Sequence, residues 1–341
     1  MAGRVRKSTR QIVAKERKIR SNKSKEFIYD PCVEHRVTFF VSTNIQRIHQ
    51  LWSCGIHEVL VSYHYIKKNL EGFTEILFSD FKKDETKKNL FMTDSGAFSF
   101  FNQDEAKEEW YDPNFWIGYI EEYVQWCYDH AECLYVVANM DLDGYVGREV
   151  VDEWNEKYFR PLSKVVNVCF IAHADTLGIH GDRYGLKRLE EYARSFDYVG
   201  VASGMSITKL LPQIHQIQKI YNVPIHLFGY TETLPSFDLP TFAADSSSWL
   251  MADQMGVSFH ADGTNFIRLD PDMKHYRKRE KHKLKNWGNG TMDLKTLVKG
   301  RNAYHNNIYG AQSWLTFREQ VTKRARIKNK ELGTVWSHWK T

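Results

Sequence analysis

The chain has 341 residues, of which 42% are hydrophobic, 14% aromatic and 26% charged, a composition that suits a globular protein with a sizeable core. No apolar run reaches the roughly 18 residues of a membrane span, and no apolar segment follows the basic N-terminus as a secretory signal requires. The five cysteines are scattered and odd in number, which argues against a disulfide framework and indicates the cytoplasm.

The net charge of +5 is unevenly distributed along the chain. Residues 1–26 carry a net charge of +8 and residues 256–341 carry +11, whereas residues 27–255 carry −14. We expect a basic flexible arm over 1–26, a catalytic domain over 27–255 and a basic, mostly helical C-terminal extension over 256–341. Binding of a polyanion through the basic ends is the leading interpretation, and solvated tails are the alternative.

Eight short runs rich in β-branched and aromatic residues are predicted as strands. They are Val37–Ser42, Glu58–Tyr63, Leu90–Thr93, Leu134–Asn139, Asn167–Ala172, Tyr198–Ala202, Ile225–Phe228 and Thr241–Ala244.

Six segments with helical spacing of apolar residues lie between these runs or after the last one. They are Ile45–Cys54, Asn114–Asp129, Arg148–Phe159, Leu186–Arg194, Ile207–Tyr221 and Ser247–Met255. Eight strands in alternation with helices predict an α/β fold with a parallel sheet closed into a (β/α)₈ TIM barrel, with a doubly wound open sheet as the alternative.

Reactive groups of such barrels gather where the strands end. The third predicted strand runs into Asp94, Ser95, Gly96 and, two residues later, Phe98. This order places a carboxylate at the barrel mouth with backbone amides and a flat ring beside it. An ordinary Asp-Ser-Gly turn explains the same residues equally well.

The fourth and fifth predicted strands also end in polar residues. Asp141 and Asp143 follow the fourth strand, where they can bind a divalent metal, contact a purine edge or cap a turn. His173 follows the fifth strand and is either a pocket residue or a structural one.

The last strands end in small residues and a further carboxylate. Ser203, Gly204 and Met205 allow a planar ligand to approach the backbone, or form a simple turn. Asp245 precedes the hydroxyl-rich Ser246 and Ser247, which is typical either of a nucleophile beside a phosphate site or of a helix N-cap.

The C-terminal extension contains a dense basic run with interleaved aromatic residues, a pattern that binds phosphates and stacks on bases. A helix-like segment follows from Tyr304 to about Arg326. The cationic residues that we expect to contact a nucleic-acid backbone are Lys274, Arg277, Lys278, Arg279, Lys281, Lys283 and Lys285. A helical cap with a solvated basic face is the alternative.

Taken in order, these motifs resemble those of the tRNA-guanine transglycosylase superfamily over about residues 37–255. The run Thr93–Phe98 looks like the Asp-Ser-Gly-Gly-Phe signature of that family, with Ala97 in place of the second glycine. The resemblance implies that Asp94 is the general acid/base and that Phe98 is the ring on which the base stacks.

The same resemblance assigns further base-binding positions. Asp141 lies where the family carries an aspartate that reads the purine edge, and Ala172-His173 lies at its Gln-Gly position. Ser203-Gly204-Met205 lies at its Gly-Gly-Leu position, and Asp245 at its nucleophile.

Three departures from the family pattern point to a divergent branch. The C-terminal zinc motif Cys-x-Cys-x-x-Cys is absent, Ser99 replaces the glutamine after the signature phenylalanine, and His173 replaces the specificity glutamine. The best match is the branch of phage and bacterial enzymes that insert 7-deazaguanines into DNA. In a phage protein the compartment is the host cytoplasm.

The resemblance implies replacement of guanine in DNA by a 7-deazaguanine base through a covalent glycosyl-aspartate, without a cofactor or a metal. DNA and the free base are the expected partners, no membrane is involved, and a homo-oligomer or an accessory protein remains open. Three alternatives stay open: a transglycosylase acting on tRNA, a metal-dependent barrel hydrolase that uses Asp94, Asp141, Asp143, His173 and Asp245, and a catalytically silent DNA-binding barrel.

Overall fold

The computed structural model describes residues 38–43, 47–81, 89–101, 107–173, 183–202, 207–230, 243–246, 258–262, 265–269 and 315. The basic arm over 1–26, the predicted helix Ser247–Met255 and the basic run from Lys274 to Lys285 lie outside these residues.

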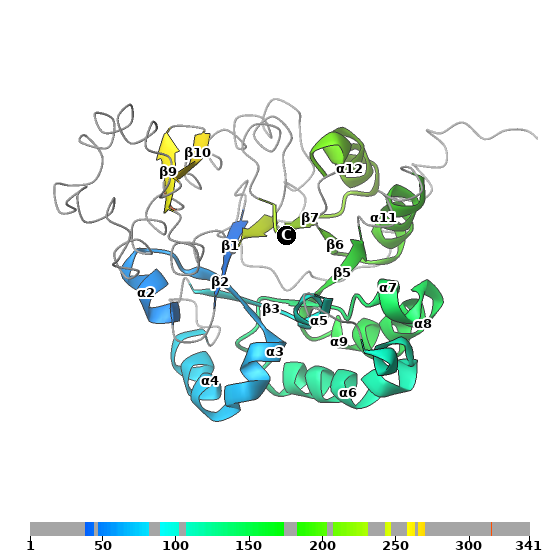
Figure 1. Cartoon of the computed structure of the whole chain (residues 1–341), viewed down its shortest axis with the longest axis horizontal. Coiled ribbons are helices and arrows are strands. Elements are labelled where there is room, and N and C mark those ends of the chain that lie inside the picture. The colour runs from blue at the N-terminus through cyan, green and yellow to red at the C-terminus, as the bar shows by residue number, and fades with distance from the viewer. Residues whose placement is uncertain are drawn as a thin grey trace, which may run out of the picture.

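The centre of the fold is a closed barrel of parallel strands (Figure 1). Each strand pairs with the next in chain order, and the last pairs with the first from Thr38 opposite Ala243 to Val41 opposite Ser246. The eight strands are β1 (Thr38–Ser42), β2 (Glu58–Ser62), β3 (Leu90–Asp94), β4 (Val136–Ala138), β5 (Asn167–His173), β6 (Val199–Ala202), β7 (Ile225–Phe228) and β8 (Ala243–Ser246). The prediction of an α/β barrel is confirmed, and the open-sheet alternative is wrong.

The strand ends differ from the prediction in ways that affect the site. Asp94, His173 and Asp245 were each expected just beyond a strand, and each lies within one. The strands extend this far because their backbones pair with the neighbouring strands: Asp94 pairs with Ser62, His173 with Ala202, and Asp245 with Phe40.

Helices lie outside the ring of strands and cover its outer face (Figure 1). The α-helices are α2 (Ile48–Ser53), α3 (Tyr63–Ile66), α4 (Leu70–Ile76), α5 (Ala97–Phe101), α6 (Pro113–Asp129), α7 (Asp143–Val146), α8 (Arg148–Trp154), α9 (Arg160–Leu162), α11 (Arg183–Ser195) and α12 (Ile207–Tyr221). Short 3₁₀ turns are η3 (Lys67–Asn69) and η5 (Glu108–Tyr111), and π-helical turns are η4 (Leu77–Phe81) and η6 (Asn155–Phe159). The helical connection from Tyr63 to Phe81 was not predicted.

The longest helix, α6, shows how local sequence determines an element. Pro113 occupies its first turn, where no backbone donor is lost, and the Asp112 carboxylate accepts a hydrogen bond from the Asn114 amide (2.9 Å). Trp116, Ile120 and Tyr123 recur at helical spacing and are buried against the barrel. Both the cap and the buried face are visible in the sequence.

Two apolar clusters follow the alternation of side chains along the strands. The larger one fills the space between strands and helices and includes Val61, Phe91 and Leu227. The smaller one includes Leu60 and Met92, which are next to Val61 and Phe91 on the same strands, and Ala243 on β8, and it therefore lies inside the barrel. Residues two positions further along, such as Asp94 and Asp245, face the interior by the same alternation.

The C-terminal extension contains an antiparallel hairpin of β9 (Ser258–Asp262) and β10 (Asn265–Leu269), which was not predicted. The two residues between these strands in the sequence are Gly263 and Thr264, and a two-residue connection that begins with glycine is a hairpin signal that the interpretation of the sequence overlooked. Leu315, within the predicted helix that starts at Tyr304, is helical and packs on the outer apolar cluster, so this part of the extension contacts the barrel domain.

Candidate active site

Asp94 is held at the end of β3 inside the barrel. The backbone amide of Gly96 donates a hydrogen bond to its Oδ1 (2.8 Å). Burial raises the pKa of Asp94 to about 6, and the charges of Asp141 and Asp245 add to the rise, while hydrogen bonds from Ser62 and Gly96 oppose it. A carboxyl group with this pKa changes its protonation state near neutral pH.

The turn after Asp94 requires glycine. Gly96 has a φ of +84°, and a Cβ atom added there would lie 2.6 Å from the Cβ of His64. Ser95 is buried, its hydroxyl accepts a hydrogen bond from the Ala97 amide (3.3 Å), and its carbonyl accepts one from the Tyr119 hydroxyl (2.7 Å). Ser95 and Gly96 therefore build the turn that positions Asp94.

Asp245 lies on β8 with a side chain that is 9% exposed. Its Oδ1 accepts a hydrogen bond from the Gly229 amide (3.0 Å) and lies 3.1 Å from Nε2 of His226. The other ring nitrogen of His226 lies 3.2 Å from the hydroxyl of Tyr198. Asp245 is therefore a buried carboxylate oriented by its neighbours, and the N-cap alternative concerns Ser247 and later residues, which lie outside the described residues.

His226, Tyr198 and Gly229 were not among the residues that sequence reasoning selected. One signal was present in the run Ile225–Phe228, because the alternation that buries Leu227 on the outer face turns His226 toward the interior. A histidine in an otherwise apolar, inward-facing position needs polar partners, but the sequence does not tell which ones.

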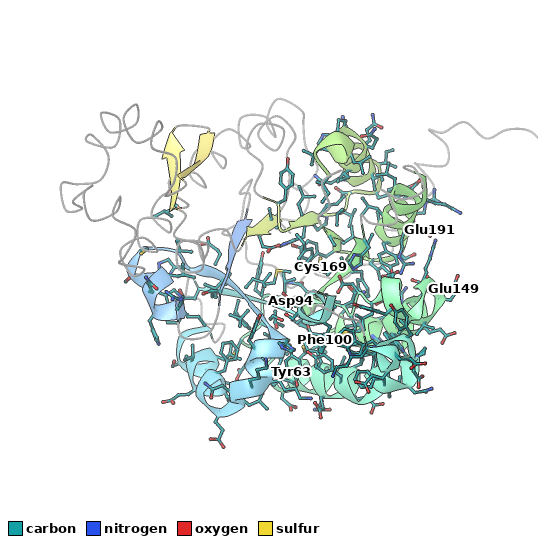
Figure 2. All side chains as sticks on the ribbon, viewed as in Figure 1. Tyr63, Asp94, Phe100, Glu149, Cys169 and Glu191 are labelled. Carbon is teal, nitrogen blue, oxygen red and sulfur yellow. The ribbon has the colours of Figure 1, made fainter. Side chains whose placement is uncertain are left out.

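The carboxylates of Asp94, Asp141 and Asp245 share one region of the barrel interior. The charges of Asp141 and Asp245 both raise the pKa of Asp94, and both also raise that of the buried thiol of Cys169 after burial itself. Figure 2 places Asp94 and Cys169 within the ring of strands, whereas Glu149 and Glu191 lie on the outer helices. Side chains from β3, β8 and the end of β4 thus come together although they are far apart in sequence.

His173 forms an ion pair with Asp141. The distance between its Nε2 and Oδ2 of Asp141 is 2.8 Å, and the same nitrogen lies 2.9 Å from the carbonyl oxygen of Asp141. Burial lowers the pKa of His173, but the charge and hydrogen bonds of Asp141 and the charge of Asp143 outweigh it and raise the pKa to about 9. His173 is therefore an imidazolium at neutral pH, beside a carboxylate with little exposure.

Asp143 forms an ion pair with a buried arginine. Nη2 of Arg188 lies 2.6 Å from Oδ1 of Asp143, and its Nη1 lies 3.0 Å from Oδ1 of Asp152. Burial raises the pKa of Asp143, and the charge of Arg188 opposes the rise. The Tyr192 hydroxyl also donates to Asp152 (3.0 Å), so Asp143 belongs to a structural ionic network between α7, α8 and α11.

Several residues of the predicted site lie outside the description. The backbone of Phe98 is part of α5, but its side chain is not described, and the same holds for Ser246 on β8. Ser203, Gly204, Met205, Ser247 and the lysines and arginines from Lys274 to Lys285 lie outside the described residues entirely.

No group of three or more histidine, cysteine, aspartate or glutamate side chains suited to a metal ion occurs among the residues that the structure describes. Within the same residues, no helix has both the length and the apolar character needed to cross a membrane.

Comparison with known proteins adds no assignment. No family model matches the chain, and no curated protein matches it significantly. The functional argument therefore depends on the geometry of the site.

Proposed function

We propose that this protein is a base-exchange transglycosylase that replaces guanine in DNA with a 7-deazaguanine base. The observation that carries the proposal is the presence of two carboxyl groups in different environments inside one barrel, a partly buried Asp94 and a buried Asp245. Asp94 has a pKa of about 6, and Asp245 is oriented by donors on one of its oxygens. Two titratable groups that differ in this way suit an acid/base and a nucleophile of one reaction.

In the proposed reaction Asp245 attacks C1′ of a deoxyguanosine and forms a covalent glycosyl-aspartate. The bond between C1′ and N9 of guanine breaks, and protonated Asp94 delivers a proton to the departing base. The incoming 7-deazaguanine then loses a proton to Asp94 and attacks C1′, which releases Asp245. Two displacements at the same carbon retain the β configuration, as in retaining glycosidases.

Asp141 and His173 are the proposed readers of the base. A carboxylate accepts hydrogen bonds from N–H groups of a guanine edge, and an imidazolium donates to its carbonyl oxygen. The ion pair between Asp141 and His173 holds both groups in place, which supports recognition of a base that presents donors and an acceptor side by side.

DNA is the proposed polymer because both ends of the chain are strongly basic and the family's tRNA-linked zinc motif is absent. A base within a duplex cannot reach the interior of a barrel, so the target nucleotide must be flipped out or lie in a single strand.

The test is incubation with DNA or tRNA and labelled 7-deazaguanine bases, followed by mass spectrometry of the nucleosides. We expect label in DNA and release of guanine, unchanged by a chelator. Asp245→Asn should abolish exchange and leave DNA binding nearly intact, whereas Asp129→Asn, on the exposed end of α6, should keep full activity.

Three results would contradict parts of the proposal. Label in tRNA alone would replace the substrate, loss of activity with chelator would favour a metal-dependent hydrolase, and full activity of Asp245→Asn would remove the nucleophile.

A further inference from the structure

Three buried side chains on or next to adjacent strands form a series of polar contacts inside the barrel. Tyr198 precedes β6, His226 lies on β7 and Asp245 on β8, and their residues are 1%, 0% and 6% exposed. The Tyr198 hydroxyl lies 3.2 Å from Nδ1 of His226, and Nε2 of His226 lies 3.1 Å from Oδ1 of Asp245.

We propose that His226 is a positioning residue that orients the Asp245 carboxylate for attack, and that Tyr198 fixes the imidazole tautomer. The proposal rests on the proposed function in so far as Asp245 is its nucleophile. It adds two residues for which the resemblance implies no role.

The direction of the hydrogen bonds follows from the chemistry of the three groups. Oδ1 of Asp245 already accepts a hydrogen bond from the Gly229 amide, so the Nε2 atom that faces this oxygen carries the hydrogen. In the neutral imidazole that we propose, Nδ1 then carries a lone pair and the Tyr198 hydroxyl donates to it. The opposite tautomer would place the lone pair of Nε2 against Asp245, two acceptors 3.1 Å apart.

The surroundings of the ring keep this arrangement in place. The ring of Phe228 packs on His226 with a centroid distance of 4.2 Å, and both imidazole nitrogens have polar partners, so a flip of the ring would break both contacts. The Gly229 amide donates to the same Oδ1 (3.0 Å). Two donors on one oxygen fix the rotation of the carboxylate about its Cβ–Cγ bond.

A merely structural histidine would fill the barrel interior without affecting catalysis selectively. Because His226 is fully buried, loss of stability alone does not separate the two roles. Substitutions that keep or remove the donor to Asp245 do separate them, since glutamine places an amide N–H near the position of Nε2 and phenylalanine fills the space without a donor.

The kinetic test compares wild type, His226→Gln, His226→Phe and Tyr198→Phe in single-turnover formation of the glycosyl-enzyme on DNA. We expect His226→Phe to lower the rate of glycosyl-enzyme formation at saturating DNA by on the order of 10- to 100-fold, with little change in the DNA concentration that gives half of this rate, as for other residues that orient a reacting group. His226→Gln should recover most of the rate, and Tyr198→Phe should lose less than His226→Phe. Equal rates for wild type and His226→Phe, or equal losses in both His226 variants, would overturn the proposal.

A second measurement does not depend on activity. A long-range ¹H–¹⁵N spectrum of histidine-labelled protein, with the His226 signals identified by their loss in His226→Gln, reports the tautomer directly. We expect the hydrogen on Nε2, and a shift of Nδ1 in Tyr198→Phe and of Nε2 in Asp245→Asn. A hydrogen on Nδ1, or shifts that neither substitution changes, would refute the orientation of Asp245 by His226. Absence of base exchange in the wild type would instead count against the proposed function alone.

Discussion

Removal of Arg188 should destabilise the protein strongly, because it would leave a buried carboxylate without its cation. The side chain of Arg188 is 4% exposed and that of Asp143 is 6% exposed, and their closest atoms are 2.6 Å apart. The guanidinium also lies 4.5 Å from the centre of the Tyr192 ring. Arg188→Leu keeps part of the aliphatic volume and removes all of these polar contacts.

Breaking a buried ion pair by removing one partner costs about 3–5 kcal/mol. Part of this cost is avoided when Asp143 binds a proton, since burial already raises its pKa and the charge of Arg188 limits the rise. Without Arg188 the pKa of Asp143 rises further. A carboxyl group with a raised pKa contributes stability below its unfolded pKa and loses it as the pH rises through the folded pKa. The variant should therefore be most destabilised at pH 8 and less so at pH 5.

The assay is urea denaturation of wild type and variant at both pH values. Arg188→Leu combined with Asp143→Asn should recover part of the lost free energy of unfolding at pH 8, because the uncompensated charge is gone. Lys187→Leu is the matched control on α11, since its ion pair with Glu191 is exposed and such pairs contribute less than about 1 kcal/mol. A loss below about 1 kcal/mol in Arg188→Leu, or a loss of equal size at pH 5 and pH 8, would refute the reasoning.

Two further predictions concern the turn at the end of β3. In the wild type, the raised pKa of Asp94, about 6, lowers the free energy of unfolding as the pH rises through that value. Asp94→Asn removes this loss, so the substitution should raise the free energy of unfolding by up to about 3 kcal/mol more at pH 8 than at pH 4. Urea titrations at both pH values check this, and equal changes would contradict it. Gly96→Ala should lower the free energy of unfolding by at least about 1–3 kcal/mol and impair base exchange, because of its φ of +84° and the close approach to His64. Gly118→Ala on α6 is the control, because a Cβ atom there meets nothing within 4 Å. This variant should leave the free energy of unfolding unchanged or raise it by up to about 1 kcal/mol. Similar melting curves for the two alanine variants would argue against backbone strain at Gly96.

Local pattern explains why so much of the barrel was predictable. A strand buried on both faces needs apolar residues at nearly every position, so Glu58–Ser62 and Asn167–His173 stand out from their surroundings. Helix α6 was predictable because it has a cap and an apolar face of its own. The connection between Tyr63 and Phe81 was missed because it is broken into short α, 3₁₀ and π segments with no sustained period.

The aspartates at the strand ends were also predictable, because parallel strands bring their carboxyl ends to one rim whatever the connections between them. This rule selected Asp94, Asp141 and Asp245 from the sequence, and the structure brings their charges together. It also selected Asp143, which forms an ion pair with Arg188.

The sequence by itself predicted the eight strands, their alternation with helices, and the position of Asp94 and Asp245 where strands end. Only the tertiary structure decided that β8 pairs with β1 and that Arg188 forms an ion pair with Asp143. It alone also decided that His226 contacts both Asp245 and Tyr198. The physical reason is that the period of a strand or helix depends on residues close together in the sequence. The partner of a buried charge depends instead on how elements far apart in the sequence pack, and a sequence pattern does not give the distances between those elements.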